Sequence, residues 1–195
     1  MKPSLVDSQF DELNGVLKNK LGLINSAELT KLAADFTTVR SVQLLSKPIR
    51  GKFDIPHLRA IHRYLFQDIF PWAGDFREVT TARTNSFSFP PPIYIESSLN
   101  TIFAAIRTEN HLKNLDPDMF ALRAGYYLGE INAVHPFREG NGRTQREFIR
   151  TLALTAGHRL VWTNLAQEEN NHASRISYAT GDSSLLAALI RKRLL

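Results

Sequence analysis

A base, a carboxylate, two glycines and two arginines follow one another in the stretch from His135 to Arg146. His135 has an ordinary pKa of about 6.5, so it can accept a proton from a hydroxyl group near neutral pH. Glu139 offers the hard oxygen ligands that Mg²⁺ takes together with substrate phosphates. These residue types, in this order, indicate a site for a magnesium-bound nucleotide polyphosphate.

The two arginines, Arg143 and Arg146, lie in the first turn of a predicted helix. Cations are normally unfavourable there, because the unpaired amides already create a partial positive charge. A bound anion reverses this balance, and phosphate is the natural candidate. Gly140 and Gly142 let the main chain turn tightly and approach a ligand, and Asn141 between them can cap the helix.

Two predicted helices hold this loop at its ends. The apolar residues before it recur at helical spacing and predict a buried helix that Pro136 stops directly after His135. The apolar residues after the loop resume that spacing, and Gly157 ends the second helix. The first set is Phe120, Ala124, Tyr127, Leu128, Ile131 and Val134, and the second is Phe148, Ile149, Leu152, Ala153 and Ala156.

Helical patterns dominate the rest of the chain and predict a mainly α fold, a single-domain helical bundle. We expect its core at about residues 50–160, N-terminal helices within 10–45 and a C-terminal helix at 183–195. That last helix would end in solvent with Arg191, Lys192 and Arg193, where cations suit the helix dipole.

Capping patterns mark the start of two other helices. Asn25 predicts one helix start, and Asp54 followed by Pro56 predicts another. His57 and His62 on the second of these helices are expected to pack in the core. Their spacing puts them on different helix faces, so a shared metal ion is not expected.

Residues 77–95 form the β-like region of the sequence. Residues 77–81 and 93–95 have strand composition, and the prolines at 90–92 exclude a helix between them. A small β-hairpin is the simplest arrangement. A helix at about 93–112 would then begin as the second strand.

The composition narrows the function class further. The chain has a net charge of +5 and no cysteine, which excludes disulfides and thiol catalysis. Its basic residues are scattered, so direct nucleic-acid binding is a remote alternative. No apolar stretch is long enough to cross a membrane, and the first residues lack the apolar run of a signal peptide, so we expect a soluble, cytoplasmic protein.

At residues 135–146 the sequence resembles the Fic family, whose signature is His-Pro-Phe-x-(Asp/Glu)-Gly-Asn-(Gly/Lys)-Arg-x-x-Arg, and every position matches. The resemblance extends upstream to Gly51-Lys52-Phe53-Asp54 and to Trp72-Ala73-Gly74. It implies the Fic fold and a protein adenylyltransferase, which transfers AMP from ATP to a side-chain hydroxyl of a target protein.

The resemblance also implies roles for the residues of the loop. His135 would deprotonate the target hydroxyl as general base, and Glu139 would hold Mg²⁺. The remaining loop residues would bind the phosphates of ATP, with Arg143 nearest the γ-phosphate. These residues are Phe137, Arg138, Gly140, Asn141, Gly142, Arg143 and Arg146.

Outside the loop, the resemblance implies a hairpin flap that lies over the active site and pairs with an extended target segment. Its candidate docking residues are Thr84, Phe87, Phe89, Pro91 and Pro92. Asn170, Asn171 and Ser174 on a later helix are the candidates for adenine recognition, although a polar, solvated helix face explains them as well.

The resemblance further concerns control. Fic proteins are typically held inactive by a helix with the pattern (Ser/Thr)-x-x-x-Glu-(Gly/Asn), whose glutamate pairs with the second arginine of the signature. Ser8 with Glu12 is the nearest match, but Leu13 breaks the pattern. Similarity to the toxin class therefore implies a separate small antitoxin that binds the N-terminal helices and pairs with Arg146.

The target and the donor stay open at this point. The chain would be a toxin or an effector secreted into a host cell, with a DNA topoisomerase or a small GTPase among the targets that relatives modify. Gly142 favours AMP transfer, since the kinase-like toxins carry lysine there, but a phosphocholine-transferring relative shares the motif. A nucleotide-binding module without catalysis would not need His135.

Overall fold

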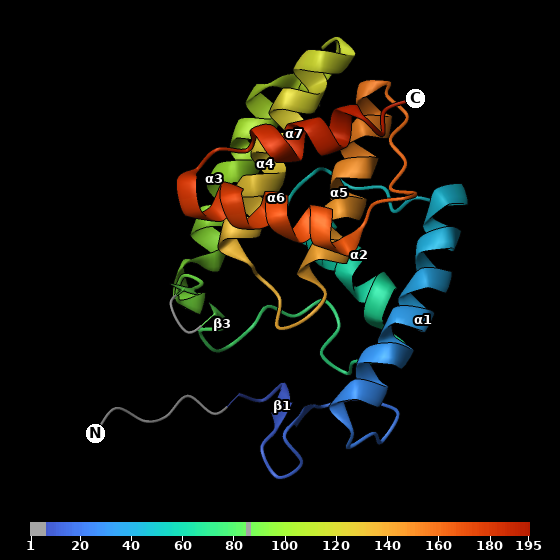
Figure 1. Ribbon diagram of the computed structural model, residues 1–195, viewed down its shortest axis with the longest axis vertical. Helices are drawn as coiled ribbons and strands as arrows, with labels where there is room; N and C mark the ends of the chain where they lie inside the picture. Colours follow the sequence, from blue (N-terminus) through green and yellow to red (C-terminus); the bar gives the residue numbers. More distant parts are fainter. Residues whose placement is uncertain (1–6, 85–86) are drawn as a thin grey trace.

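The computed structural model describes residues 7–84 and 87–195. Figure 1 shows a bundle of helices with short β-hairpins at one end. None of the helices in the described ranges has the length and apolar character that crossing a bilayer requires. The helices are α1 (Ser26–Ser46), α2 (Ile55–Phe66), α3 (Ile95–Thr108), α4 (Pro117–Val134), α5 (Asn141–Ala156), α6 (Gln167–Thr180) and α7 (Ser184–Arg191).

Short elements connect these helices. Two 3₁₀ helices, η1 (Pro92–Tyr94) and η2 (Asn110–Leu112), flank α3. Strand β1 (Phe10–Asp11) pairs antiparallel with β2 (Val16–Leu17), and β3 (Ala82–Thr84) pairs antiparallel with β4 (Phe87–Ser88). The prediction of a mainly α fold with a small hairpin is confirmed.

The helix starts follow the capping residues that the sequence predicts. The Asn25 side chain accepts hydrogen bonds from the first amides of α1, and the Asp54 side chain accepts one from the amide of His57 in α2. Pro56 lies in the first turn of α2, where its missing N–H costs no hydrogen bond. Local chemistry therefore fixes where α1 and α2 begin.

Helix α4 lies at the centre of the molecule and packs against α3, α5, α6 and α7. One hydrophobic cluster extends from Leu29 in α1 to Ile190 in α7. Helix α7 crosses close to α4 (Figure 1), and a Cβ atom at Gly125 would lie only 2.6 Å from the main-chain nitrogen of Ala187. The glycine thus lets α7 approach, and the rigid α4 carries His135 at its end.

The structure corrects the expected strands. Residues 93–95 do not form a strand: η1 and the first residue of α3 occupy them. The reason is that Pro91 and Pro92 suit the start of a helix, since proline fixes φ near the helical value. Residues 77–81 are also not a strand: β3 begins at Ala82, and the main-chain N–H of Arg77 donates to the Pro136 carbonyl.

The two chain ends also differ from expectation. Residues 10–17 form the β1–β2 hairpin, so Ser8 and Glu12 lie in no helix. The expected solvated basic end is wrong for Arg193, which is 6% exposed and pairs with Glu169 of α6 at 2.9 Å. Leu194 forms a β-bridge with residue 160. The ion pair links the C-terminal segment to α6.

Candidate functional site

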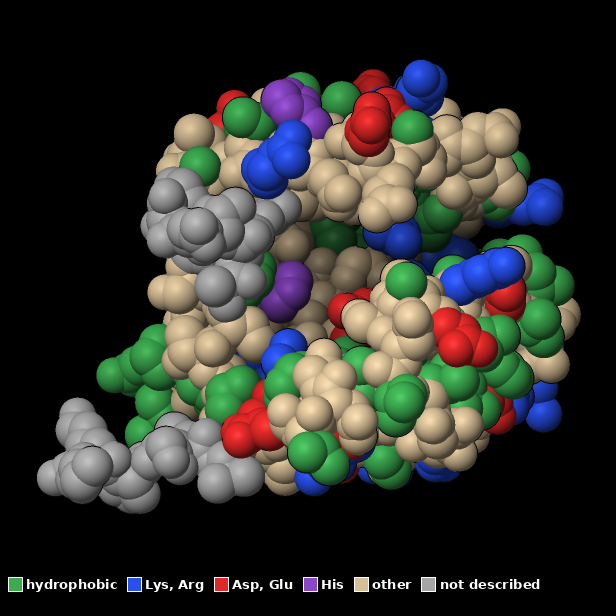
Figure 2. Space-filling model, turned by 60° about the horizontal axis from the view of Figure 1, so that its bottom comes forward, with side chains coloured by type: hydrophobic (Ala, Val, Ile, Leu, Met, Phe, Trp, Pro, Cys, Tyr) green, Lys and Arg blue, Asp and Glu red, His purple; other side chains and the backbone are tan. Residues whose placement is uncertain are grey.

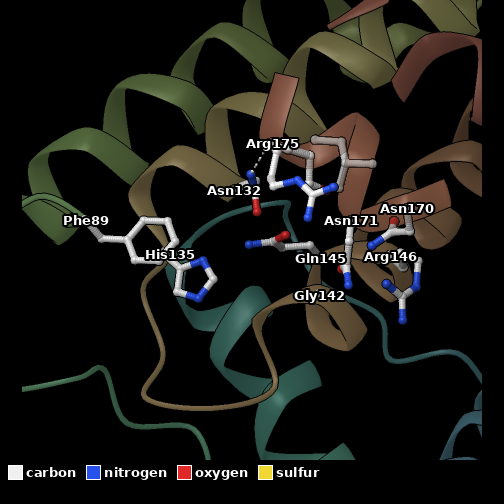
Figure 3. Close-up of a pocket in the computed structure, with 11 residues that line it drawn as sticks. Phe89, Asn132, His135, Gly142, Gln145, Arg146, Asn170, Asn171 and Arg175 are labelled. Atoms are coloured by element: carbon white, nitrogen blue, oxygen red, sulfur yellow. Dashed lines mark hydrogen bonds between the residues drawn. The ribbon is translucent and has the colours of Figure 1, made fainter. Parts of the chain in front are cut away.

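His135 is the C-terminal cap of α4 and adopts a left-handed conformation, with φ 47° and ψ 61°. This conformation is uncommon outside glycine and costs on the order of 1–3 kcal/mol. It turns the chain sharply into Pro136. The imidazole stacks on the ring of Phe89, with ring centroids 3.7 Å apart, and both lie at the same end of the site in Figure 3.

The loop after His135 is closed by Asn141. The side-chain Oδ1 of Asn141 accepts from the Phe137 amide at 2.9 Å, and its Nδ2 donates to the Phe137 carbonyl at 2.7 Å. The sequence suggested that Asn141 caps α5, but its side chain is used within the loop and does not cap the helix. Gly140 is the N-cap residue with φ 81°, and a Cβ atom there would lie 2.1 Å from Cζ of Phe66.

The first turn of α5 has main-chain donors that could bind an anion. The amides of residues 141–143 have no acceptor within the helix, as in the first turn of any helix, and they carry the positive end of its dipole. Gly142 lines the adjoining cavity. A phosphate group there would find main-chain donors at close range.

The cavity has a volume of about 420 Å³ and lies between the end of α4, the start of α5 and helix α6. Figure 2 shows this hollow with a histidine inside it and basic side chains at its rim. Its lining, within the part of the chain that the structure describes, contains no acidic residue. The lining residues are Phe89, Leu128, Asn132, His135, Gly142, Gln145, Arg146, Asn170, Asn171, Ser174 and Arg175.

Arg146 supplies a charge at the end of the cavity away from His135 (Figure 3). Burial and, to a smaller extent, the nearby charge of Arg143 lower the pKa of Arg146 to about 10. The guanidinium is still charged at neutral pH. Because a partly desolvated cation gains most from a counter-charge, this end of the cavity favours an anionic ligand.

Arg143 points elsewhere, contrary to the expectation that both arginines grip phosphate. Its Nη2 pairs with Oε1 of Glu139 at 2.9 Å, and its Nη1 donates to Oγ1 of Thr37 in α1 at 2.9 Å. The guanidinium also lies over the Phe66 ring, 4.8 Å from its centroid. These contacts hold the side chain between α1 and the loop, outside the cavity lining.

Two other predicted phosphate ligands also face away from the cavity. Phe137 is fully buried and stacks on His62 at 3.9 Å between ring centroids. Arg138 pairs with Asp7 at 2.8 Å and covers the ring of Phe10. Tertiary contacts behind the loop take both side chains, so neither lies in the cavity lining, and a role of these two residues in phosphate binding stays a prediction. They anchor the loop from its far side.

His62 supports the same loop from α2. Its Nδ1 accepts from the Gly74 amide at 2.8 Å, so Nε2 carries the proton and donates to the Glu139 carbonyl at 3.1 Å. Burial lowers the pKa of His62 to about 3, so the ring is neutral. The prediction that His57 and His62 are core residues is confirmed, since both are buried.

The structure describes only part of the flap. Phe89 lines the cavity, whereas Pro91 is the N-cap of η1, Pro92 is its first residue, and neither proline is among the lining residues. The hydroxyl of Tyr178 in α6 donates to the Ser88 carbonyl at 2.9 Å and so joins the flap to the opposite wall. Thr84 and Phe87 belong to β3 and β4, but their side chains lie outside what the structure describes.

The three candidates for adenine contacts, Asn170, Asn171 and Ser174, all lie on α6 and line the cavity. Sequence reasoning missed Asn132, Gln145 and Arg175 in the same lining. The missed residues include two with a usable signal, because Asn132 is one helical turn before His135 and Gln145 is one turn after Gly142. Such spacing places each pair on one helix face.

Glu139 is the candidate for a magnesium ligand. Its side chain is 46% exposed and one of its oxygens accepts from Arg143. No cluster of three or more potential metal ligands occurs within residues 7–84 and 87–195. Glu139 does not line the cavity, but it lies two residues before the start of α5. A single exposed carboxylate at this position fits Mg²⁺, which takes one or two carboxylates and completes its shell with phosphate and water.

Comparison with known proteins shows to which family this chain belongs. The model of the Fic/DOC family matches residues 52–153. The chain belongs to the Fic/DOC family. Protein adenylyltransferase VbhT of Bartonella schoenbuchensis is 44% identical over 96% of this chain, although the match covers only 39% of that longer protein. The probable protein adenylyltransferase Fic of Salmonella typhimurium is 39% identical over 91% of this chain and 86% of that protein.

A solved Fic structure has the same fold. It is the N-terminal Fic domain of a VirB-translocated effector from Bartonella quintana, with bound ADP. It is 28% identical to this chain, with a TM-score of 0.88 over 96% of this chain and 94% of that one. The helical Fic fold is therefore shown for this chain, and the loop at residues 135–146 is its Fic signature.

Proposed function

We propose that this chain is a protein adenylyltransferase, which transfers AMP from ATP to a side-chain hydroxyl of a target protein and releases pyrophosphate. The observation that carries this proposal is the position of His135 at one end of a cavity that also contains Arg146 and the start of α5, without an acidic lining residue in the described ranges. The names of the relatives and the ADP bound in the Bartonella quintana domain support it.

In the proposed reaction, the target hydroxyl oxygen attacks the α-phosphorus of ATP. A bond forms between that oxygen and the α-phosphorus, and the bond from the α-phosphorus to the bridging oxygen breaks. Pyrophosphate leaves with the electron pair, and His135 takes the proton of the hydroxyl. Arg146 and the first amides of α5 neutralise the phosphate charge, as phosphoryl-type transfers require.

Glu139 is proposed to hold Mg²⁺ on the phosphates. When bound, the ion would act as a Lewis acid and neutralise phosphate charge. The pair between Arg143 and Glu139 fixes the direction of this carboxylate. Arg143 thereby contributes through Glu139, and Arg146 makes the direct phosphate contact.

The two walls of the cavity would bind different parts of the two substrates. We assign the adenine and ribose to the α6 wall, with Asn170, Asn171 and Ser174. The target segment would dock along the flap, where Phe89 bounds the cavity and Thr84, Phe87, Pro91 and Pro92 would contact the chain next to the modified hydroxyl. A hydroxyl that enters between the walls then meets His135.

Gly142 favours AMP transfer over the reaction of the kinase-like toxins. A Cβ atom at this position would lie 3.2 Å from Nη1 of Arg146. A side chain at this position, such as the lysine of kinase-like toxins, would therefore crowd the guanidinium that we assign to phosphate. The glycine keeps Arg146 in its present position.

A separate antitoxin remains our proposal for control. It would supply an acidic side chain to Arg146, whose end of the cavity has no acidic lining residue in the described ranges. Helix α1 exposes Phe36, Val39, Val42 and Leu45, an apolar face suited to a protein partner. Substituting Val39 and Val42 with lysine should weaken co-purification of such a partner, and unchanged co-purification would exclude α1 as the interface.

The activity is tested with ATP labelled at either the α or the γ position. The chain is incubated with each nucleotide and a bacterial or host-cell lysate, and protein-bound label is measured after electrophoresis. We expect label from the α position only, and none with His135→Ala. Label from the γ position would indicate a kinase, and the absence of label from both would defeat the proposal. Mass spectrometry of the modified proteins identifies target and residue.

A further inference from the structure

Arg77 is a buried cation directly beside the catalytic loop, although it does not line the cavity. It is 2% exposed and belongs to the segment that leads into the flap. Its guanidinium donates from Nε to the His135 carbonyl at 2.7 Å and from Nη2 to the Val134 carbonyl at 3.2 Å. One side chain thus holds the last carbonyls of α4, including that of the proposed base.

The same guanidinium also holds both ends of the flap. Its Nη1 donates to the Val79 carbonyl at 2.9 Å, and its Nη2 donates to the Pro90 carbonyl at 2.5 Å. Val79 precedes the hairpin and Pro90 directly follows Phe89, the residue that stacks on His135. The main-chain N–H of Arg77 adds a bond to the Pro136 carbonyl at 2.9 Å.

The charge of Arg77 is balanced by carbonyl dipoles. None of the ion pairs found within residues 7–84 and 87–195 includes it. Burial lowers its pKa, yet arginine stays protonated in proteins. The unpaired carbonyls at the end of α4 carry the negative end of the helix dipole, so a cation is favourable there. The buried charge therefore depends on the geometry of the His135 cap.

From these contacts we infer that Arg77 is the positioning residue of this site: it holds the left-handed cap at His135 and the flap at Phe89 in one fixed relation, so that the imidazole stays aimed at the cavity. This inference rests on the proposed transfer reaction. Arg77 acts through main-chain atoms and itself touches neither the nucleotide nor the target. Neither the strand composition of residues 77–81 nor the Fic signature at residues 135–146 assigns this role.

Only an arginine can make this set of bonds. Its five N–H donors lie in one plane and point in fixed directions, which matches carbonyls from three separate segments. Lysine keeps the charge but has a single nitrogen, which cannot reach the carbonyls of both Val79 and Pro90 together with that of His135. Arg77→Lys therefore separates geometry from charge.

The test compares Arg77→Lys and Arg77→Ala with Arg150→Ala. Arg150 is a matched control because it is also buried and binds Glu147 and the Leu44 carbonyl, outside the cavity lining. Each variant is studied at a temperature where circular dichroism shows it folded. We expect Arg77→Lys to lower kcat by about 100-fold, the loss that a misplacement of 1 Å can cause, with KM for ATP within about threefold of wild type. Arg150→Ala should lose thermal stability and keep kcat.

Two further readouts complete the test. Methylguanidinium added to Arg77→Ala should restore part of kcat by filling the vacated space. In NMR spectra of the Arg77 variants, the ring protons of His135 should lose the upfield shift that the stacked Phe89 ring causes in the wild type. This signal does not depend on the transfer reaction. A wild type without transfer would defeat the proposed function alone, whereas wild-type kcat in Arg77→Lys, or an unchanged His135 signal, would overturn the positioning role. Failure of both Arg77 variants to fold at any temperature would also overturn it, since Arg77 would then serve stability only.

Discussion

The phenyl ring of Phe89 lies flat on the imidazole of His135, with ring centroids 3.7 Å apart and 8° between the ring planes. Phe89 is 4% exposed, and its main-chain N–H donates to the Thr81 carbonyl at 3.0 Å. The ring that covers the proposed base therefore belongs to the flap. One face of His135 is closed by this stack, so a hydroxyl must approach the imidazole from the cavity.

The first prediction concerns His135 as general base. His135→Ala should lower the transfer rate by roughly 100- to 10,000-fold, the usual contribution of a positioned base, while ATP still binds. The rate is measured with α-labelled ATP, and affinity by calorimetry. His158→Ala is the control, because His158 is a second helix-end histidine that binds the Leu115 carbonyl outside the cavity. A His135→Ala variant with normal turnover would remove the assigned role.

The second prediction separates the two arginines of the loop. Arg146→Ala should weaken ATP binding by about 10- to 100-fold, because a hydrogen bond to a charged group contributes about 1.5–3 kcal/mol. Arg143→Ala should weaken it less and should instead lower thermal stability, since Arg143 joins α1 to the loop. Calorimetric titration with a non-hydrolysable ATP analogue decides this. A larger affinity loss in Arg143→Ala would reverse the assignment.

The third prediction concerns Glu139 and magnesium. Glu139→Gln should raise the Mg²⁺ concentration for half-maximal transfer by roughly tenfold or more, equivalent to a loss of about 1.4 kcal/mol. Arg143→Ala is the matched control, because it breaks the same ion pair and keeps the carboxylate. If both variants shift the magnesium dependence equally, Glu139 acts through the ion pair and is not a ligand.

The fourth prediction follows from the buried ring of His62. Burial holds its pKa at about 3, below the unfolded value of about 6.5, so the unfolded chain binds the extra proton. The contribution of His62 to the free energy of unfolding is therefore fully present above about pH 6.5. It decreases as the pH falls toward 3, by up to about 1.4 kcal/mol per pH unit. Urea unfolding of wild type and His62→Gln between pH 5 and 7 measures this. Parallel slopes for the two proteins would contradict it.

The fifth prediction concerns Gly140. Gly140→Ala should cost about 1–2 kcal/mol for the left-handed conformation and about 1–3 kcal/mol more for the clash with Phe66. Gly157→Ala is the control, because its φ is 90° and nothing lies within 4 Å of the added Cβ. Urea unfolding should therefore show a much larger loss for Gly140→Ala. Equal losses would mean that Phe66 moves aside freely.

The local structure of the loop could be predicted from the sequence because neighbouring residues dictate it. Pro136 ends α4 after His135, and Gly157 ends α5 in the left-handed conformation it permits. The directions of the side chains could not be predicted in this way. Phe137 and Arg138 follow the signature, but partners far along the chain turn both away from the cavity.

The same limit explains what sequence reasoning missed. Arg77 stands in a segment of strand composition, and nothing nearby indicates that its side chain is buried against α4. Asn170 and Asn171 were ambiguous, because a polar helix face in solvent has the same composition as one that lines a cavity. Only the packing of α6 across from α5 decides between the two.

Arg193 does not line the cavity, yet it holds Glu169 near the beginning of α6. Loss of this ion pair would allow α6 to move, together with its cavity-lining residues Asn170, Asn171 and Arg175. A genetic screen for lost nucleotide affinity should therefore return substitutions at position 193 beside those at Arg146. Proximity to the ligand is then a poor guide to which mutations matter in this protein.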